Sequence, residues 1–215
     1  MFKTIYGEYE SEIVEKKSKF IGKVKAIGTE LEAKEYISAQ RKIYYDARHI
    51  VYGYILGKEE KRYSDDGEPS LTAGVPILKI LEHGNFFYTI VIVVRYFGGI
   101  LLGTGGLSRA YSLAAQKVLE QAIILENEEY ERVAINFRYE FFSKINNELR
   151  KNNCYVEEII YDTEVRVIFY VRENFYDNIL EKIGEILGKK IFTEKVKVIG
   201  TIYDKKFISY GDRNG

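Results

Sequence analysis

A run of apolar residues at 90–94 is the clearest secondary-structure signal in the sequence. Its neighbours extend it to 89–96, and a continuously apolar strand is typical of the centre of a sheet that is covered on both faces. A glycine-rich segment follows, and apolar residues then recur at helical spacing from Leu107 to about Ile124. We therefore predict a buried strand, a glycine-rich turn and an amphipathic helix, in that order.

The chain before this strand alternates strand and helix signals. Thr29 and Glu32 fit a capping box, and proline suits the first turn of a helix. The pattern predicts a strand at 18–27, a helix from Thr29 to about Lys42, a strand at 49–56, a polar loop at 58–69 and a short helix from Pro76 to Gly84.

The second half has its own rhythm after a charged linker at 127–131. The pattern predicts a strand at 133–139, a helix at 142–151, a hairpin of 155–161 and 164–171, a helix at 174–187 capped by Gly188, and a strand at 190–198. This βαββαβ order is that of the ferredoxin-like fold. We expect an α+β protein with domains at 1–127 and 131–202, followed by a tail at 203–215 whose last residues, 211–215, are frayed.

Charge and composition limit the partners. The 215 residues include 32 Lys plus Arg and 32 Asp plus Glu, so the formal net charge is zero. A protein that follows a long nucleic-acid backbone carries a basic excess, so contact with RNA must come from a local patch. The N-terminus lacks the apolar core of a signal peptide and no apolar run approaches the ~18 residues of a membrane span. We expect a cytoplasmic protein without a membrane partner.

Cys154 is the single cysteine, which excludes an intrachain disulfide and a thiolate zinc cluster. A buried, neutral thiol is the favoured interpretation and a nucleophile is the alternative. We expect no cofactor and name no catalytic residue.

The segment 95–109 is the strongest candidate site. Glycines let another molecule approach bare backbone, and the amides and dipole at a helix start favour an anion. The sequence lacks the Gly-Lys-Ser/Thr of a P-loop and the acidic partner of a dinucleotide site. A pocket for a phosphate or acidic group and a turn that serves packing alone both remain open. The candidate ligands are Arg95, Gly98, Gly99, Gly103, Thr104, Gly105, Gly106, Ser108 and Arg109.

Three polar segments are candidates for partner binding. Asp65, Asp66 and Glu68 would suit a hard cation or a basic partner, but turn formation and helix capping are favoured, so no metal site is predicted. His49, at a strand start, is a candidate base or ligand beside the commoner structural role. Basic and aromatic residues alternate around 16–20, which suits RNA, an acidic partner or protection of a sheet edge. The basic candidates there are Lys16, Lys17 and Lys19.

Five motifs, in this order, resemble the IMPACT/YigZ family. They are Lys-Ser-Lys-Phe-Ile at 17–21, Asp-Ala-Arg-His at 46–49, Ser-Asp-Asp-Gly-Glu-Pro-Ser at 64–70, Thr-Ala-Gly at 72–74 and Arg-Tyr-Phe-Gly-Gly-Ile-Leu-Leu-Gly-Thr-Gly-Gly-Leu at 95–107. The match covers about residues 1–125, and the second half resembles the small ferredoxin-like domain that follows in bacterial members. The chain is thus similar to bacterial YigZ-type proteins.

The resemblance implies an N-terminal domain with the ribosomal protein S5 domain 2-like fold and a C-terminal domain similar to one in translation elongation factor G. Eukaryotic relatives regulate translation through protein partners during amino-acid starvation, and no catalytic activity is attached to the bacterial branch. The family's polar positions fall on Lys19, His49, Asp65, Asp66, Glu68, Arg95, Thr104 and Arg109. Two positions depart from the pattern: relatives commonly have glycine at Leu71 and often lysine at Val75.

We therefore expect a non-catalytic binding protein, a translation-linked regulator that contacts RNA, the ribosome or a protein partner through the glycine-rich turn and the adjacent polar motifs. The alternative is an enzyme or sensor of a phosphorylated small molecule bound at the same helix start.

Overall fold

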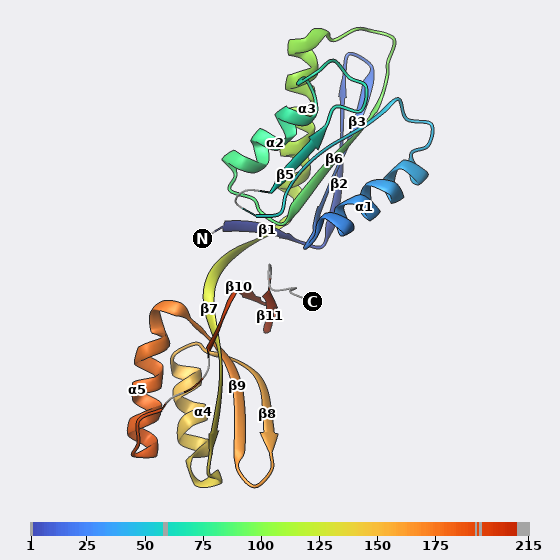
Figure 1. Cartoon of the computed structure of the whole chain (residues 1–215). Helices are drawn as coiled ribbons and strands as arrows, with labels where there is room; N and C mark the ends of the chain where they lie inside the picture. Colours follow the sequence, from blue (N-terminus) through green and yellow to red (C-terminus); the bar gives the residue numbers. More distant parts are fainter. Residues whose placement is uncertain (1, 58–59, 192, 194, 210–215) are drawn as a thin grey trace. The chain divides into compact units, whose positions relative to one another are not determined.

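The computed structural model describes residues 2–57, 60–191, 193 and 195–209. The chain divides into two compact units, one spanning Phe2–Glu126 and one that begins at Asn127 (Figure 1).

The described residues of the N-terminal unit build a five-stranded antiparallel sheet. Its order is β2 (Glu8–Glu15), β3 (Ser18–Ala26), β6 (Thr89–Tyr96), β4 (His49–Ile55) and β5 (Lys61–Ser64). A further strand, β1 (Phe2–Tyr6), pairs with β7 (Ile123–Phe137), which continues into the second unit. The predicted central strand is confirmed, since β6 lies in the middle and is buried from Thr89 to Arg95.

Helices cover both faces of this sheet (Figure 1). Helix α1 (Glu30–Ile43) packs on one face, and α2 (Gly74–His83) and α3 (Gly103–Gln121) pack on the other. Alternate residues of β6 contribute to the two cores: Val91 and Val93 lie in the core on the α2–α3 side, and Ile90, Ile92 and Val94 lie in the core on the α1 side. Because strand side chains alternate between faces, a strand between two helix layers must be apolar throughout.

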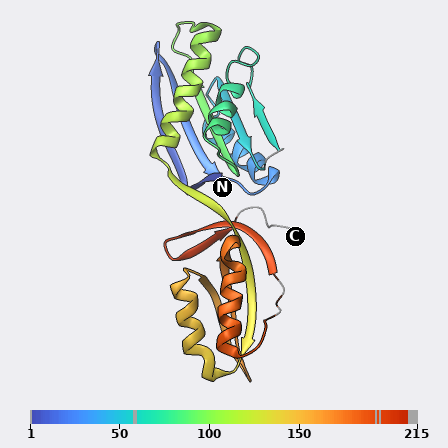
Figure 2. The ribbon, with the colours of Figure 1, turned by 90° about the vertical axis from the view of Figure 1, so that its left-hand side faces the viewer.

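The second unit has the helix and strand order expected from its sequence. Strand β7 is followed by a 3-10 turn (Tyr139–Phe141), α4 (Phe142–Lys151), β8 (Tyr155–Tyr161), β9 (Val165–Arg172), a second 3-10 turn (Glu173–Phe175), α5 (Tyr176–Leu187), β10 (Lys195–Tyr203) and β11 (Lys206–Ser209). The sheet order is β11-β10-β7-β9-β8, with α4 and α5 side by side on one face (Figure 2).

Four sequence predictions are corrected by the structure. The polar loop at 58–69 contains the edge strand β5, whose residues are polar because they are largely exposed. The charged linker at 127–131 is part of β7, where Asn127 and Glu131 are fully buried and Lys195 lies 3.3 Å from the Glu131 carboxylate. The last strand begins at Lys195 rather than 190, and the tail after Ile202 includes β11. The expected fraying at 211–215 lies outside the described residues.

Candidate functional site

A buried ion pair joins Arg95, at the end of β6, to Glu68, in the loop before α2. Their side chains lie 2.6 Å apart, Arg95 Nη1 to Glu68 Oε1, and the two residues are only 5% and 8% exposed. The Tyr111 hydroxyl, from α3, donates to the same carboxylate oxygen over 2.7 Å. Burial, followed by the Glu68 charge, raises the pKa of Tyr111, so this hydroxyl stays a donor. The pair therefore ties the loop to both β6 and α3.

His49 joins this cluster because β4 pairs with β6 in a register that sets it opposite Arg95. His49 Nδ1 lies 2.7 Å from the carbonyl oxygen of Asp66, which can only accept, so Nδ1 carries the proton. His49 Nε2 then faces Glu68 Oε1 at 3.8 Å, beyond hydrogen-bond distance. His49 makes no hydrogen bond to a serine, threonine or cysteine among the described residues.

The acidic loop around Asp65 and Asp66 bonds mainly to backbone. Asp65 accepts from the amides of Leu71, Ala73 and Gly74 over 2.8–3.0 Å, which ties it to the start of α2. These contacts agree with the turn interpretation, but neither Ser70 nor Thr72, the capping residues favoured by the sequence, caps α2: the residue at its N-cap is Ala73, and Asp65 accepts from the first amides instead.

Asp66 links the same loop to two other elements. It accepts from the Ile50 amide and pairs with Arg41 of α1, both over 2.6 Å. No cluster of metal-ligating residues occurs within the described ranges.

The glycine-rich turn rests directly on the lysine turn between β2 and β3. A Cβ atom on Gly98 would lie 2.0 Å from the carbonyl carbon of Lys17, so only glycine fits there. The Gly98 amide also donates to Ser18 Oγ over 3.2 Å, and Arg95 Nη2 lies 3.4 Å from the same oxygen. The buried pair, Ser18 and the two turns thus form one connected unit.

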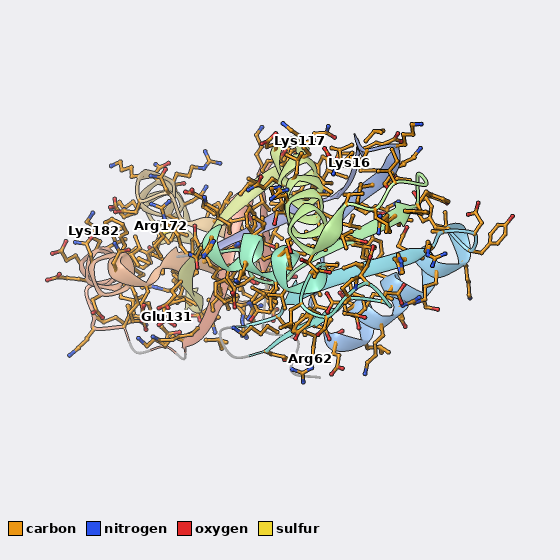
Figure 3. All side chains as sticks on the ribbon, turned by 90° about the horizontal axis from the view of Figure 1, so that it is seen from above. Lys16, Arg62, Lys117, Glu131, Arg172 and Lys182 are labelled. Atoms are coloured by element: carbon orange, nitrogen blue, oxygen red, sulfur yellow. The ribbon has the colours of Figure 1, made fainter. Side chains whose placement is uncertain are left out.

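The outer side of this unit is exposed, and we call it the turn surface. Leu101 is 82% exposed, and no side chain caps α3 at its start, whose first turn has no acidic residue. The Arg109 guanidinium lies beside Gly105, 3.6 Å from where its Cβ would stand. Lys16 lies on the outside of the unit (Figure 3). The turn surface consists of Lys16, Lys17, Phe97, Ile100, Leu101 and Arg109.

The structure separates the candidate residues into two groups. The first group, which we call the buried network, centres on the buried pair Glu68–Arg95 and includes the half-buried His49, Asp65 and Asp66 through the contacts above. The exposed group surrounds the start of α3 and comprises Lys16, Lys17, Gly98, Gly99, Gly103, Thr104, Gly105, Gly106, Ser108 and Arg109, of which Gly98, Gly106 and Ser108 are half-buried.

Lys19 stands apart and pairs with Glu12 over 2.6 Å. Sequence reasoning missed Ser18 and Tyr111 as members of the network. Ser18 lies inside a motif whose most prominent residues are lysines. Tyr111 occupies an apolar position of the helix, so the sequence pattern explains its ring as core packing and does not indicate a hydrogen-bonding role for its hydroxyl.

Cys154 lies in the second unit, where burial, followed by the Glu148 charge, raises the pKa of its thiol to about 12. The thiol is therefore neutral near pH 7, as the favoured interpretation required. None of the helices among the described residues is long and apolar enough to cross a lipid bilayer.

Comparison with known proteins identifies the protein family to which this chain belongs. The family model of the Impact N-terminal domain matches residues 16–119, and that of a domain of unknown function, DUF1949, matches residues 135–188. The protein is thus a two-part α+β protein with an Impact N-terminal domain. The IMPACT family member YvyE of Bacillus subtilis is 37% identical over 189 residues, which cover 87% of each chain. This chain belongs to the IMPACT family.

Two further proteins are similar to it. The IMPACT family member YigZ of Escherichia coli is 39% identical over 110 residues, covering 49% of this chain and 54% of YigZ. The crystal structure of a hypothetical protein, 25% identical, superimposes with a TM-score of 0.59 and covers 91% of this chain and 96% of its own.

Proposed function

We propose that this protein is a non-catalytic regulator linked to translation, and that it contacts its partner through the turn surface. Membership of the IMPACT family supports the link to translation, because the resemblance to this family implies regulators that act through protein partners. The observation that carries the proposal is the exposed glycine-rich turn, which presents apolar and cationic side chains from a base fixed by the Glu68–Arg95 pair.

The composition of the turn surface favours a protein partner with an acidic, partly apolar segment. Phe97, Ile100 and Leu101 are exposed within one five-residue segment, and buried apolar contact drives most protein–protein association. Lys16, Lys17 and Arg109 add positive charge. The uncapped amides at the start of α3 add a further preference for a carboxylate. An RNA partner would need more cations and fewer exposed aliphatic side chains.

The buried network has a supporting role in this proposal. Arg95 is engaged by Glu68, and Asp66 by Arg41 and the Ile50 amide, so these groups hold the turn instead of touching the partner. The same contacts count against Asp66 and Glu68 as acid–base groups, because these carboxylates already bond to Arg41, the Ile50 amide, Arg95 and Tyr111.

We further propose cytoplasmic domains at 1–127 and 131–202, the first S5 domain 2-like and the second ferredoxin-like. The order β10-β7-β9-β8 and the βαββαβ sequence of elements support the second assignment.

Co-sedimentation with purified ribosomes tests the proposal. The wild-type chain should pellet with ribosomes, and Leu101→Asp should raise the Kd for ribosomes about tenfold, as expected for the loss of one well-buried apolar contact. Leu31→Asp on α1 is the matched control, since Leu31 is 66% exposed and lies outside the turn surface. Equal binding by the two variants, or no binding by the wild type, would contradict the proposal.

The same samples separate the other candidate partners. Binding that falls steeply with salt and survives Leu101→Asp would indicate RNA phosphates instead of a protein. A thermal shift with phosphorylated metabolites that Arg109→Ala removes would indicate the small-molecule sensor.

A further inference from the structure

The second unit contains a cavity of about 410 Å³ whose charged lining is entirely cationic among the described residues. It lies beside β7 and β9, where the chain leaves α5. Arg166, Lys189 and Lys190 supply the charges, and Asn136 and Thr193 supply neutral polar groups. A cavity of this size falls in the range of small-molecule sites, roughly 300–1,000 Å³.

Two features of the fold bring these cations together. Asn136 and Arg166 are direct partners across β7 and β9, so they lie next to each other on the sheet. Lys189 is placed by the end of α5: Gly188 has a left-handed backbone (φ 65°), and the Lys189 amide donates to the Gly184 carbonyl over 3.1 Å. The pairing of β7 with β9 therefore places Arg166, and the C-terminal cap of α5 places Lys189, in the lining of the same cavity.

The cations lack a common structural explanation. The negative end of the α5 dipole accounts for lysines just after the helix. It does not account for Arg166, which projects from a strand. Arg166 and Lys189 make no ion pair with any other residue in the described part of the chain. A neighbouring cavity of about 490 Å³ shares Lys189 and Lys190 and includes Asp177 and Glu181, but Arg166 lines only the first cavity.

We propose that this cavity binds a phosphate-type anion, with Arg166 as the principal ligand. A guanidinium can make two parallel bonds to phosphate oxygens, while Lys189 and Lys190 add point charges and Asn136 adds an amide donor. The phosphate belongs to a small metabolite or to a nucleic-acid backbone, and the two sources present the same chemistry to the cavity. This site lies in the other unit from the turn surface and is independent of the proposed function.

Titration of the isotope-labelled full chain with pyrophosphate, followed by amide NMR, tests the proposal. Pyrophosphate should shift the amides of Asn136, Arg166 and Lys189, and Arg166→Gln should raise its Kd about tenfold or more, as expected for a lost charged hydrogen bond. Lys144→Gln is the matched control, because Lys144 is an exposed lysine on α4 that does not line the cavity. It should leave the Kd within about twofold.

Competition identifies the source of the phosphate. Displacement of pyrophosphate by a short oligouridylate at lower concentration supports a nucleic-acid phosphate, and no displacement supports a small phosphorylated ligand. Shifts confined to other residues, or equal Kd values for the wild type and Arg166→Gln, would overturn the proposal. Because Arg166 is exposed, an unchanged circular-dichroism spectrum of the variant excludes misfolding as the cause.

Discussion

Glu68 and Arg95, separated by 26 intervening residues, meet as a buried ion pair with 2.6 Å between Oε1 and Nη1. The pair connects the end of the central strand β6 to the loop that precedes α2. Ser18 extends the connection to the glycine-rich turn. The exposed turn surface is thereby built on a buried electrostatic anchor.

Glu68→Gln should strongly destabilise the N-terminal unit. Removing one partner of a buried pair leaves the other charge uncompensated, which costs about 3–5 kcal/mol. Amide exchange of β6 during urea unfolding would report the free energy of unfolding of this unit. Lys19→Met is the control, because it breaks the exposed Lys19–Glu12 pair, which contributes about 0–1 kcal/mol. A loss for Glu68→Gln no larger than that of the control would contradict the anchor.

Gly98→Ala should also destabilise this unit, by about 1–3 kcal/mol or more. The new methyl group would meet the Lys17 backbone at 2.0 Å, and backbone cannot move aside as a side-chain tip can. Gly105→Ala is the matched change in the first turn of α3, where the nearest atom is the flexible tip of Arg109 at 3.6 Å. Thermal unfolding of both variants tests the difference, and equal stabilities would show that the two turns do not pack as described.

Leu71→Gly should stabilise the protein by about 0.5–1 kcal/mol. Leu71 has φ 64°, a left-handed backbone that costs a residue with a Cβ atom roughly 1–2 kcal/mol, partly offset by the chain entropy of glycine. The family resemblance implies glycine at this position in relatives. Leu71→Ala keeps the strain and should bring no gain. A stabilised alanine variant would show that loss of the exposed leucine side chain, and not relief of backbone strain, causes the effect.

Lowering the pH should remove the contribution that the Glu10 carboxylate, on β2, makes to the free energy of unfolding. Burial acts to raise the pKa of Glu10, but hydrogen bonds from Lys23 and Tyr44, at 3.0 Å each, outweigh it and lower that pKa below its ordinary value. A carboxyl whose pKa is lowered by folding stabilises the protein above its unfolded pKa and loses this effect as pH falls through the folded value.

The difference in unfolding free energy between wild type and Glu10→Gln should therefore shrink as pH falls from about 6 to about 3. Urea denaturation at several pH values measures it. A difference that stays constant over this range would mean that Glu10 is not held in its charged form by these partners.

The sequence predicted individual helices and strands well, but it predicted contacts between residues far apart in sequence poorly. Helix α4 and strand β6 were predicted with the bounds observed, because helical periodicity and a continuous apolar run are properties of neighbouring residues. Strand β5 was missed because exposed edge strands need no apolar residues. The start of β7 was missed because the burial of Glu131 depends on Lys195, which lies far away in sequence.

The site shows the same division. The glycine-rich turn was visible from its composition, and the acidic loop from its charges. The sequence did not show that His49, Glu68 and Arg95 lie together, because their proximity follows from the register in which β4 pairs with β6. Tyr111 is the clearest example of what the sequence pattern cannot predict. Its ring occupies an apolar position of the helix, while its hydroxyl donates a hydrogen bond to the buried Glu68 carboxylate.

Photo-crosslinking to purified ribosomes tests the proposed turn surface most directly. A photoreactive phenylalanine analogue replaces Leu101 in one variant and Leu31 in another, since both side chains are exposed. The account predicts crosslinks to a ribosome-associated protein from position 101 and none above background from position 31. Equal yields from the two positions, or crosslinks from position 31 alone, would contradict it.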